Sequence, residues 1–177
     1  IKNLTLFVFS TENWKRERIE VNFLMRLAQK AFVDFLNDFR KRGIKIRVIG
    51  QKQRLPKFLQ EQIKKTEEAT KNNKEITVNF ALSYGGRAEI IEAIKELIRK
   101  KIPPEKISEK TISQNLWTSD VDLIIRTGRE QRISNFLIWQ AAYSEFYFLN
   151  KYWPDFIEKD LDQALAEYAR RQRRFGK

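Results

Sequence analysis

Short runs of apolar residues alternate along the chain with longer segments in which apolar residues recur every three or four positions. The short runs are rich in β-branched and aromatic residues and end in polar or glycine-containing loops, which is typical of buried strands. They predict strands at 4–9, 44–49, 76–82, 121–125 and 146–148.

The longer segments have the spacing of helices. In the first of them the apolar positions predicted to face the core are Leu24, Leu27, Ala28, Ala31, Phe35 and Phe39, and Gly43 ends the segment. In the second, over 56–73, they are Leu59, Ile63, Thr66 and Ala69. Further helices are predicted around Ile91, Ile94 and Ile98, and over 108–116, 135–143 and 158–173.

Strands and helices therefore alternate through the whole chain. This order predicts an α/β fold with a mostly parallel central sheet flanked by helices on both faces. No linker or repeat interrupts the pattern, so we expect a single domain over residues 1–177. The first residues already have the pattern of a strand, and no methionine precedes them, so we expect a further amino-terminal strand and loop to be missing from this sequence.

The charge of the chain limits the partners that it can have. Lysine and arginine number 35 against 23 aspartates and glutamates, a formal charge of +12. This favours phosphorylated small molecules, nucleic acid or an anionic membrane face as partners. No apolar run approaches the ~20 residues of a membrane span.

The chain has no cysteine and no histidine. Within this stretch, disulfide frameworks, thiolate zinc sites and serine–histidine triads are thereby excluded. Catalysis would have to use carboxylates, arginine, lysine, hydroxyls, amides or a bound ion. The composition is typical of a cytosolic protein.

Candidate chemistry gathers in loops that follow strands, where ligands bind in open α/β sheets. Three such loops carry arginine: 10–18, 83–87 and 126–134. The last holds three arginines, Arg126 and Arg132 among them, and Ser134 stands where a helix N-cap is predicted. Guanidinium groups beside a helix amino terminus favour a diphosphate. A solvated loop whose arginines pair with Glu130 and Asp122 would explain the same spacing equally well.

The loop at 10–18 places an amide, an indole and a guanidinium together, on Asn13, Trp14 and Arg16. One interpretation assigns them to a ligand site. The other has Trp14 covering the core beneath the loop while Glu12 pairs with Arg16. The second is favoured for Trp14, and both stay open for Asn13.

Longer motifs are more specific. The chain contains Phe9-Ser10-Thr11-Glu12-Asn13-Trp14-Lys15-Arg16, Tyr84-Gly85-Gly86-Arg87, Ile125-Arg126-Thr127-Gly128, Arg132-Ile133-Ser134-Asn135-Phe136-Leu137, Tyr143-Ser144-Glu145 and Trp153-Pro154-Asp155-Phe156. Together these blocks resemble the cis-prenyltransferases, and most closely the bacterial undecaprenyl diphosphate synthases within that family. The resemblance covers essentially all of the chain.

The resemblance implies an enzyme that adds isopentenyl diphosphate to an allylic diphosphate such as farnesyl diphosphate, with cis double bonds. The implied product is a polyprenyl diphosphate such as undecaprenyl diphosphate, the lipid carrier for cell-wall synthesis. It also implies Mg²⁺ as cofactor and a cytoplasmic homodimer. We expect peripheral contact with the inner membrane face for product release, and no nucleic-acid partner.

The resemblance also implies roles for individual residues. The diphosphate of isopentenyl diphosphate would be bound by Arg126, Arg132, Ile133 and Ser134, and Glu145 would help to hold Mg²⁺. The allylic substrate site would be lined by Ser10, Thr11, Glu12, Trp14 and Arg16. Asn13 would be the catalytic residue near the reacting carbons. Because an amide is a poor base, we expect Asn13 to orient substrate or water and a diphosphate to take the proton.

Two departures from the family pattern matter. The aspartate of an upstream phosphate-binding loop is absent from these residues, and Arg129 stands where relatives commonly have a glycine. A positive φ at that position would strain an arginine. The terminal Arg174-Phe175-Gly176 resembles the tail that approaches the site in relatives.

An apolar slot for the growing chain could be lined by Phe7, Val8, Phe32, Phe35, Ile76, Phe80 and Leu82, although such residues are more often ordinary core. Two alternative functions stay open. One is a basic nucleic-acid-binding domain, favoured by the charge and by Arg170-Arg171-Gln172-Arg173-Arg174. The other is a non-catalytic subunit of the same fold, which the absent aspartate would explain.

Overall fold

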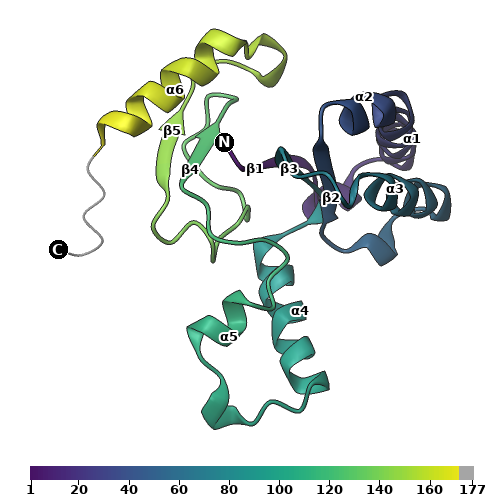
Figure 1. The fold of residues 1–177 in the computed structure, drawn as a ribbon, viewed down its shortest axis with the longest axis vertical. Coiled ribbons are helices and arrows are strands. Elements are labelled where there is room, and N and C mark those ends of the chain that lie inside the picture. Colours follow the sequence, from purple (N-terminus) through teal and green to yellow (C-terminus); the bar gives the residue numbers. More distant parts are fainter. Residues whose placement is uncertain (172–177) are drawn as a thin grey trace. The chain divides into compact units, whose positions relative to one another are not determined.

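The fold is known from a computed structural model that describes residues 1–171. The chain divides into two compact units, residues 1–89 and 90–177 (Figure 1). Each unit is described by itself below.

Three parallel strands form the sheet of the first unit, in the order β1–β3–β2. Their bounds are Asn3–Ser10 for β1, Ile44–Ile49 for β2 and Ile76–Tyr84 for β3. Asn79 of β3 lies opposite Thr5 of β1 and Arg47 of β2. Because all three strands run in one direction, the loops that follow them begin at the same edge of the sheet.

Three helices pack on this sheet: α1 (Arg18–Asp34), α2 (Leu36–Lys41) and α3 (Lys57–Thr70). Their shared core combines Phe9, Ile46, Val48, Val78 and Leu82 from the strands with Val21, Met25, Phe32, Leu59 and Ile63 from the helices. Phe32 and Leu82 are buried in it, and Ile76 and Phe80 pack against it. Ordinary core is therefore the role of these four candidate slot residues, whereas Val8 and Phe35 are about half exposed.

The prediction for the first helical segment is confirmed in part, because Leu24, Ala28 and Phe39 pack against the core. Val21, Met25 and Phe32 are buried, while Leu27 is 51% exposed and Phe35, at 53%, separates α1 from α2. Apolar residues occur all round this segment, so periodicity alone leaves the inward face open. Contact with α3 and the sheet decides it.

In α3 the predicted inward residues Leu59, Ile63 and Thr66 are buried, but Ala69 is exposed and Thr70 is buried in its place. The Thr70 hydroxyl accepts the backbone N–H of Ile46 at 3.1 Å, which ties the helix to β2. A specific hydrogen bond thus overrides the apolar pattern here.

The second unit holds a smaller sheet and its helices. α4 (Gly86–Arg99) leads into it and is followed by α5 (Glu109–Ser113), β4 (Leu123–Arg126), β5 (Glu145–Phe148) and α6 (Glu158–Arg170). β4 and β5 are parallel, with Leu123 opposite Glu145 and Arg126 opposite Phe148. The short 3₁₀ helices of the chain are Glu12–Lys15, Lys52–Arg54, Pro104–Lys106 and Trp153–Asp155.

The helix predicted over 135–143 is absent. This segment consists of turns, and Ser134, Asn135 and Leu137 have φ values of 49°, 62° and 47°. Residues in the left-handed region leave the path of a right-handed helix. The expectation that Ser134 caps a helix amino terminus was therefore wrong.

The helix predicted around Ile91, Ile94 and Ile98 is present as α4, but these isoleucines do not form its buried face. Ile91, Ile94 and Ile98 are 52%, 42% and 68% exposed, while Ala93 and Leu97 are buried. The last helix ends at Arg170 rather than Arg173, because Arg171 is extended, with φ −77° and ψ 137°. The predicted residues 172–173 and the tail Arg174-Phe175-Gly176 lie outside the described residues.

The α/β class, with parallel strands and flanking helices, is confirmed. Within residues 1–171 the strands form two sheets, of three and two strands, rather than one central sheet. None of the helices in this part of the chain has the length and hydrophobicity that a membrane crossing requires.

Candidate active site

Loops from all three strands of the first unit are joined at the carboxyl edge of the sheet. The backbone N–H of Thr11, after β1, donates to the carbonyl of Tyr84 at 2.8 Å. The N–H of Gln51, after β2, donates to the carbonyl of Ser83 at 3.0 Å. Gly50 permits this approach, because a Cβ there would lie 2.1 Å from the Leu82 carbonyl oxygen. The geometry gives a rigid rim where the sequence predicts a ligand.

Asn13 is held within its own loop. Its Oδ1 accepts the backbone N–H of Ser10 at 2.8 Å, and its own N–H donates to the Ser10 hydroxyl at 3.3 Å. Because the amide oxygen is already engaged, the Nδ2 group is the part of this side chain that can point a donor at a ligand. A positioning role suits Asn13 better than proton acceptance.

Trp14 covers the core, as the favoured interpretation predicted. Its indole lies edge-on to Phe9 at 5.1 Å between ring centroids, and its Nε1 donates to the Ser83 hydroxyl at 2.9 Å. The Arg54 guanidinium lies over the indole at 5.2 Å. Trp14 therefore connects the loops that follow β1 and β2 to the end of β3.

The expected ion pair between Glu12 and Arg16 is replaced by other contacts. Arg16 pairs with Glu20 at 2.7 Å on the surface of α1, and Glu12 accepts the Thr11 hydroxyl at 3.0 Å. Both are contacts between near neighbours in sequence.

Sequence reasoning counted Ser83 only as the start of the loop 83–87 and gave it no role of its own, and it missed Arg54. Ser83 is fully buried with a φ of 52°, a conformation that no local motif announced. Arg54 had a detectable signal, because it follows a strand that ends at Gly50 and so belongs to the same kind of loop as the three that were singled out.

In the second unit, Arg126 ends β4 and begins the arginine-rich loop. Its side chain is half buried, and its Nε is buried with no hydrogen-bond partner among the described residues. Buried polar groups without a partner are rare and costly in native structures. An anion that accepts this N–H would satisfy it, which is the fit expected of a diphosphate-binding arginine.

The rest of the loop is more open. Arg132 is exposed and pairs with Glu130, as the alternative interpretation of a solvated loop expected, and Ser134 is exposed. Arg129 has a φ of 62°, so it is in the strained conformation that its position suggested, and its guanidinium lies 5.4 Å from the centre of the Tyr152 ring.

Glu145 and Arg126 lie at opposite ends of the small sheet. Glu145 begins β5 opposite Leu123, whereas Arg126 ends β4. At ~3.3 Å per residue the three intervening steps amount to about 10 Å. Among the described residues, no ion pair joins this carboxylate to this guanidinium.

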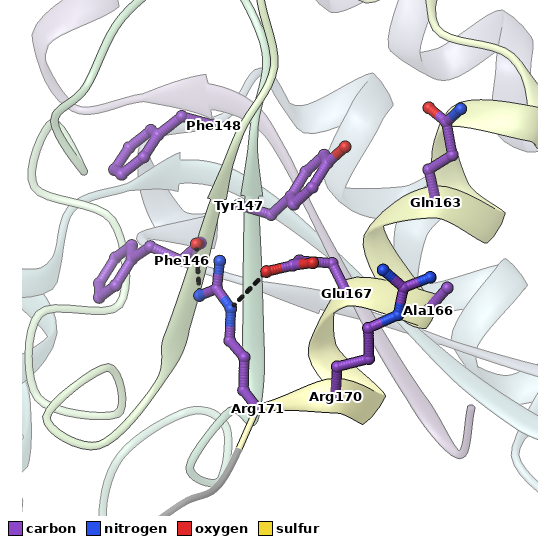
Figure 2. Close-up of a pocket in the computed structure, with 8 residues that line it drawn as sticks. All are labelled: Phe146, Tyr147, Phe148, Gln163, Ala166, Glu167, Arg170 and Arg171. Atoms are coloured by element: carbon purple, nitrogen blue, oxygen red, sulfur yellow. Dashed lines mark hydrogen bonds and ion pairs between the residues drawn. The ribbon is translucent and has the colours of Figure 1, made fainter.

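Glu145 instead has an arginine partner from the end of α6. Arg171 Nη1 lies 2.8 Å from Glu145 Oε2 and also donates to the Phe146 carbonyl at 2.9 Å. Its Nε contacts Glu167 Oε1 at 3.4 Å (Figure 2). Both carboxylates raise the pKa of Arg171, the Glu145 hydrogen bond most strongly.

A Mg²⁺ ion would depend on oxygens from outside the chain. No group of three or more acidic side chains able to hold a metal occurs among residues 1–171. Mg²⁺ is often bound through one or two carboxylates together with substrate phosphates and water. Glu145, with 27% of its side chain exposed, fits that pattern as a lone carboxylate ligand.

The sequence match decides the family. The family model described as "Putative undecaprenyl diphosphate synthase" matches residues 1–176, nearly the whole chain. This chain belongs to the cis-prenyltransferase family.

Similar proteins agree with this membership. An isoprenyl transferase of Bacillus cereus is 46% identical over 99% of this chain and 71% of its own length. A tritrans,polycis-undecaprenyl-diphosphate synthase (geranylgeranyl-diphosphate specific) of Thermoplasma volcanium is 48% identical over 100% of this chain and 72% of its own. Cis-prenyl chain elongation is thus the chemistry of the enzymes that this cis-prenyltransferase resembles.

Solved structures extend the similarity to the fold. A probable undecaprenyl diphosphate synthase of Campylobacter jejuni has a TM-score of 0.94 at 41% identity, covering 100% of this chain and 84% of the other. Lavandulyl diphosphate synthase of Lavandula x intermedia, solved with dimethylallyl diphosphate, has a TM-score of 0.90 at 40% identity and covers 100% and 80%. The cis-prenyltransferase fold therefore accounts for the whole chain.

Proposed function

We propose that this cis-prenyltransferase condenses isopentenyl diphosphate with farnesyl diphosphate to make a polyprenyl diphosphate such as undecaprenyl diphosphate, the carrier lipid of cell-wall synthesis. The observation that carries the proposal is the buried Nε of Arg126, which lacks a partner at the end of a parallel strand. A diphosphate oxygen is the acceptor that suits it.

The reaction breaks an allylic carbon–oxygen bond, forms a carbon–carbon bond and releases a proton and a diphosphate. Negative charge therefore grows on the leaving diphosphate. Preorganised guanidinium donors stabilise such charge without reorganisation in the transition state. Arg16, in the allylic substrate set, would be such a donor. Arg126 would instead hold the diphosphate of isopentenyl diphosphate, which stays on the product, together with the exposed side chains of Arg132 and Ser134. Ile133 lies between these two and would contact the substrate through its apolar side chain.

The allylic substrate is assigned to the rim of the first unit. Ser10 and Asn13 brace each other there, and Trp14 is fixed by its bond to Ser83. Thr11, Glu12 and Arg16 complete the substrate-binding set carried over from the family. In this arrangement Asn13 orients substrate through its Nδ2 donor, and a diphosphate accepts the proton.

Mg²⁺ is proposed as the cofactor. When bound, it would neutralise diphosphate charge and so assist the departure of the leaving group. Glu145 would hold it together with diphosphate oxygens and water, because no group of three or more acidic side chains that could hold a metal occurs in the described part of the chain.

A homodimer is proposed with the exposed face of α4 at its interface. Ile91, Ile94 and Ile98 line one side of this helix at spacings of three and four residues. Such a stripe suits the same stripe of a second copy across a two-fold axis. Light scattering after gel filtration should give a dimer for the wild type and a monomer for Ile94→Lys; an unchanged mass would remove α4 from the interface.

The primer and the product length are open to direct measurement. One relative carries geranylgeranyl specificity in its name and another was solved with dimethylallyl diphosphate. Incubation with each allylic diphosphate, labelled isopentenyl diphosphate and Mg²⁺, followed by chain-length analysis, identifies the primer and product. Vesicle co-sedimentation with and without product tests the proposed membrane contact.

The decisive variant is Arg126→Gln, because it removes the guanidinium while keeping a polar side chain. We expect the KM for isopentenyl diphosphate to rise at least ten-fold, consistent with loss of a charge-assisted hydrogen bond. Arg40→Gln, on the surface of α2, is the control of equal charge change and should leave KM unchanged. An unaltered KM in Arg126→Gln would refute the assignment.

Two results would favour the alternative functions. Salt-sensitive binding of nucleic acid without binding of prenyl diphosphates would favour the nucleic-acid-binding domain. Turnover that requires a second, competent family member would favour the non-catalytic subunit.

A further inference from the structure

We infer that Arg171 is a positioning residue that competes with a divalent cation for the carboxylate of Glu145. The inference rests on the proposed role of Glu145 toward Mg²⁺ and adds a means of controlling it. Arg171, at the end of α6, would bind Glu145 until a metal–diphosphate complex displaces the guanidinium from the carboxylate.

The first support is the geometry of the pair. Arg171 Nη1 and Glu145 Oε2 are 2.8 Å apart, so a hard cation cannot bind that oxygen in the same direction while the guanidinium stays. A positive ion beside the guanidinium would also be repelled at this distance. Arginine and metal are therefore alternative partners of that carboxylate oxygen.

The second support is the way in which Arg171 is held. Three acceptors bind it: Glu145, the carbonyl of Phe146, and Glu167 one helical turn earlier. Arg171 itself is the first extended residue after α6, and its N–H closes the helix on the carbonyl of Tyr168. The guanidinium can thus leave Glu145 and keep Glu167 as a partner, since that contact belongs to its own helix.

The third support is access. Arg171 lines an open cavity of about 510 Å³ between β5 and α6, together with Tyr147, Arg170 and Glu167. Figure 2 shows Arg171 reaching from the end of α6 toward β5. The side chains of the pair are 33% and 27% exposed, so water and ions reach it.

The test compares the affinity for inorganic pyrophosphate with and without Mg²⁺, measured by calorimetry on the full chain. The dissociation constant without Mg²⁺ divided by the dissociation constant with Mg²⁺ reports how much the metal strengthens binding. This ratio also cancels the general effect of a lost positive charge on anion binding. It requires no turnover, so it is independent of the proposed reaction.

Arg171→Gln should raise this ratio about five-fold over the wild type, since a competitor of about the strength of a partly exposed ion pair is removed. Arg171→Lys, which keeps the charge but loses the forked donors, should raise it less. Arg170→Gln is the matched control, because it removes the same charge from the neighbouring residue of the same cavity, and its ratio should equal that of the wild type.

The inference would be overturned if the ratio for Arg171→Gln were equal to or below that of the wild type. It would also be overturned if Glu145→Gln had the same ratio as the wild type. Thermal melts of each variant verify folding. A wild type that fails to elongate prenyl diphosphates, with the five-fold rise still present, would refute the proposed function and leave the competition for Glu145 standing.

Discussion

Replacing Trp14 with phenylalanine removes the side-chain bond that ties the loop after β1 to the end of β3. The Ser83 hydroxyl, 2.9 Å from the indole Nε1, is fully buried and loses its donor. A buried polar group left unsatisfied costs about 1–3 kcal/mol, and the Arg54 contact weakens on a smaller ring. We therefore expect a loss of about 2 kcal/mol, or about 4–8 °C in Tm for a chain of this size.

Urea unfolding followed by far-ultraviolet circular dichroism measures this loss, because the signal does not depend on tryptophan. A double-mutant cycle with Ser83→Ala should give a coupling energy of about 1 kcal/mol. The matched control is Trp139→Phe, whose indole makes the same 2.9 Å bond to the Ser113 hydroxyl. Ser113 is only half buried and can be hydrated, so that change should cost about 0.5–1 kcal/mol. Equal costs at the two tryptophans, or a coupling below about 0.3 kcal/mol, would refute the reasoning.

Three further changes test the backbone and the charges. Gly50→Ala should lower the free energy of unfolding in urea by about 3 kcal/mol or more, because the new Cβ would lie 2.1 Å from a backbone oxygen. Gly128→Ala should lower it by about 1 kcal/mol from positive φ alone, because no atom lies within 4 Å of its new Cβ. Similar costs for the two variants would contradict the steric argument. Arg129→Gly should be at least as stable as Arg129→Ala, because φ is 62° there, and a less stable glycine variant would show that strain is not the deciding term. The pKa of Asp160 is lowered by the Lys151 hydrogen bond and then by a backbone N–H, so its stabilisation is present above about pH 4 and lost as the pH falls through the folded-state pKa. Melts of Asp160→Asn and wild type should therefore differ at pH 7 and converge as the pH falls below the folded-state pKa of Asp160, and a constant difference would contradict this sign.

The positions of the strands followed from the sequence with little error. β2 spans Ile44–Ile49 as predicted, β1 is one residue longer than predicted at each end, and β3 is two residues longer at its carboxyl end. Strand pattern is local, because a buried parallel strand needs a continuous apolar run between turns. The family motifs could also be recognised from the sequence, since the residues of each motif are contiguous in the chain.

The inward faces of helices were harder to predict. In α4 the isoleucines point outward and Ala93 and Leu97 inward, and in α3 Thr70 replaces Ala69. A helix with apolar residues on more than one side has several faces that could be buried, and only its neighbours choose between them. The turns at 134–137 were also hard to predict. Apolar spacing there suggested a helix, but the backbone has positive φ at three of the four residues.

The sequence by itself determined the order of strands and helices, the basic charge and the family, because each of these depends on residues close together in the chain or on composition. The tertiary structure alone decided which side chains meet. Ser83 reaches Trp14 across 69 residues and Arg171 reaches Glu145 across 26. Such contacts depend on the path of the whole chain, and neither partner carries a local signal of the other.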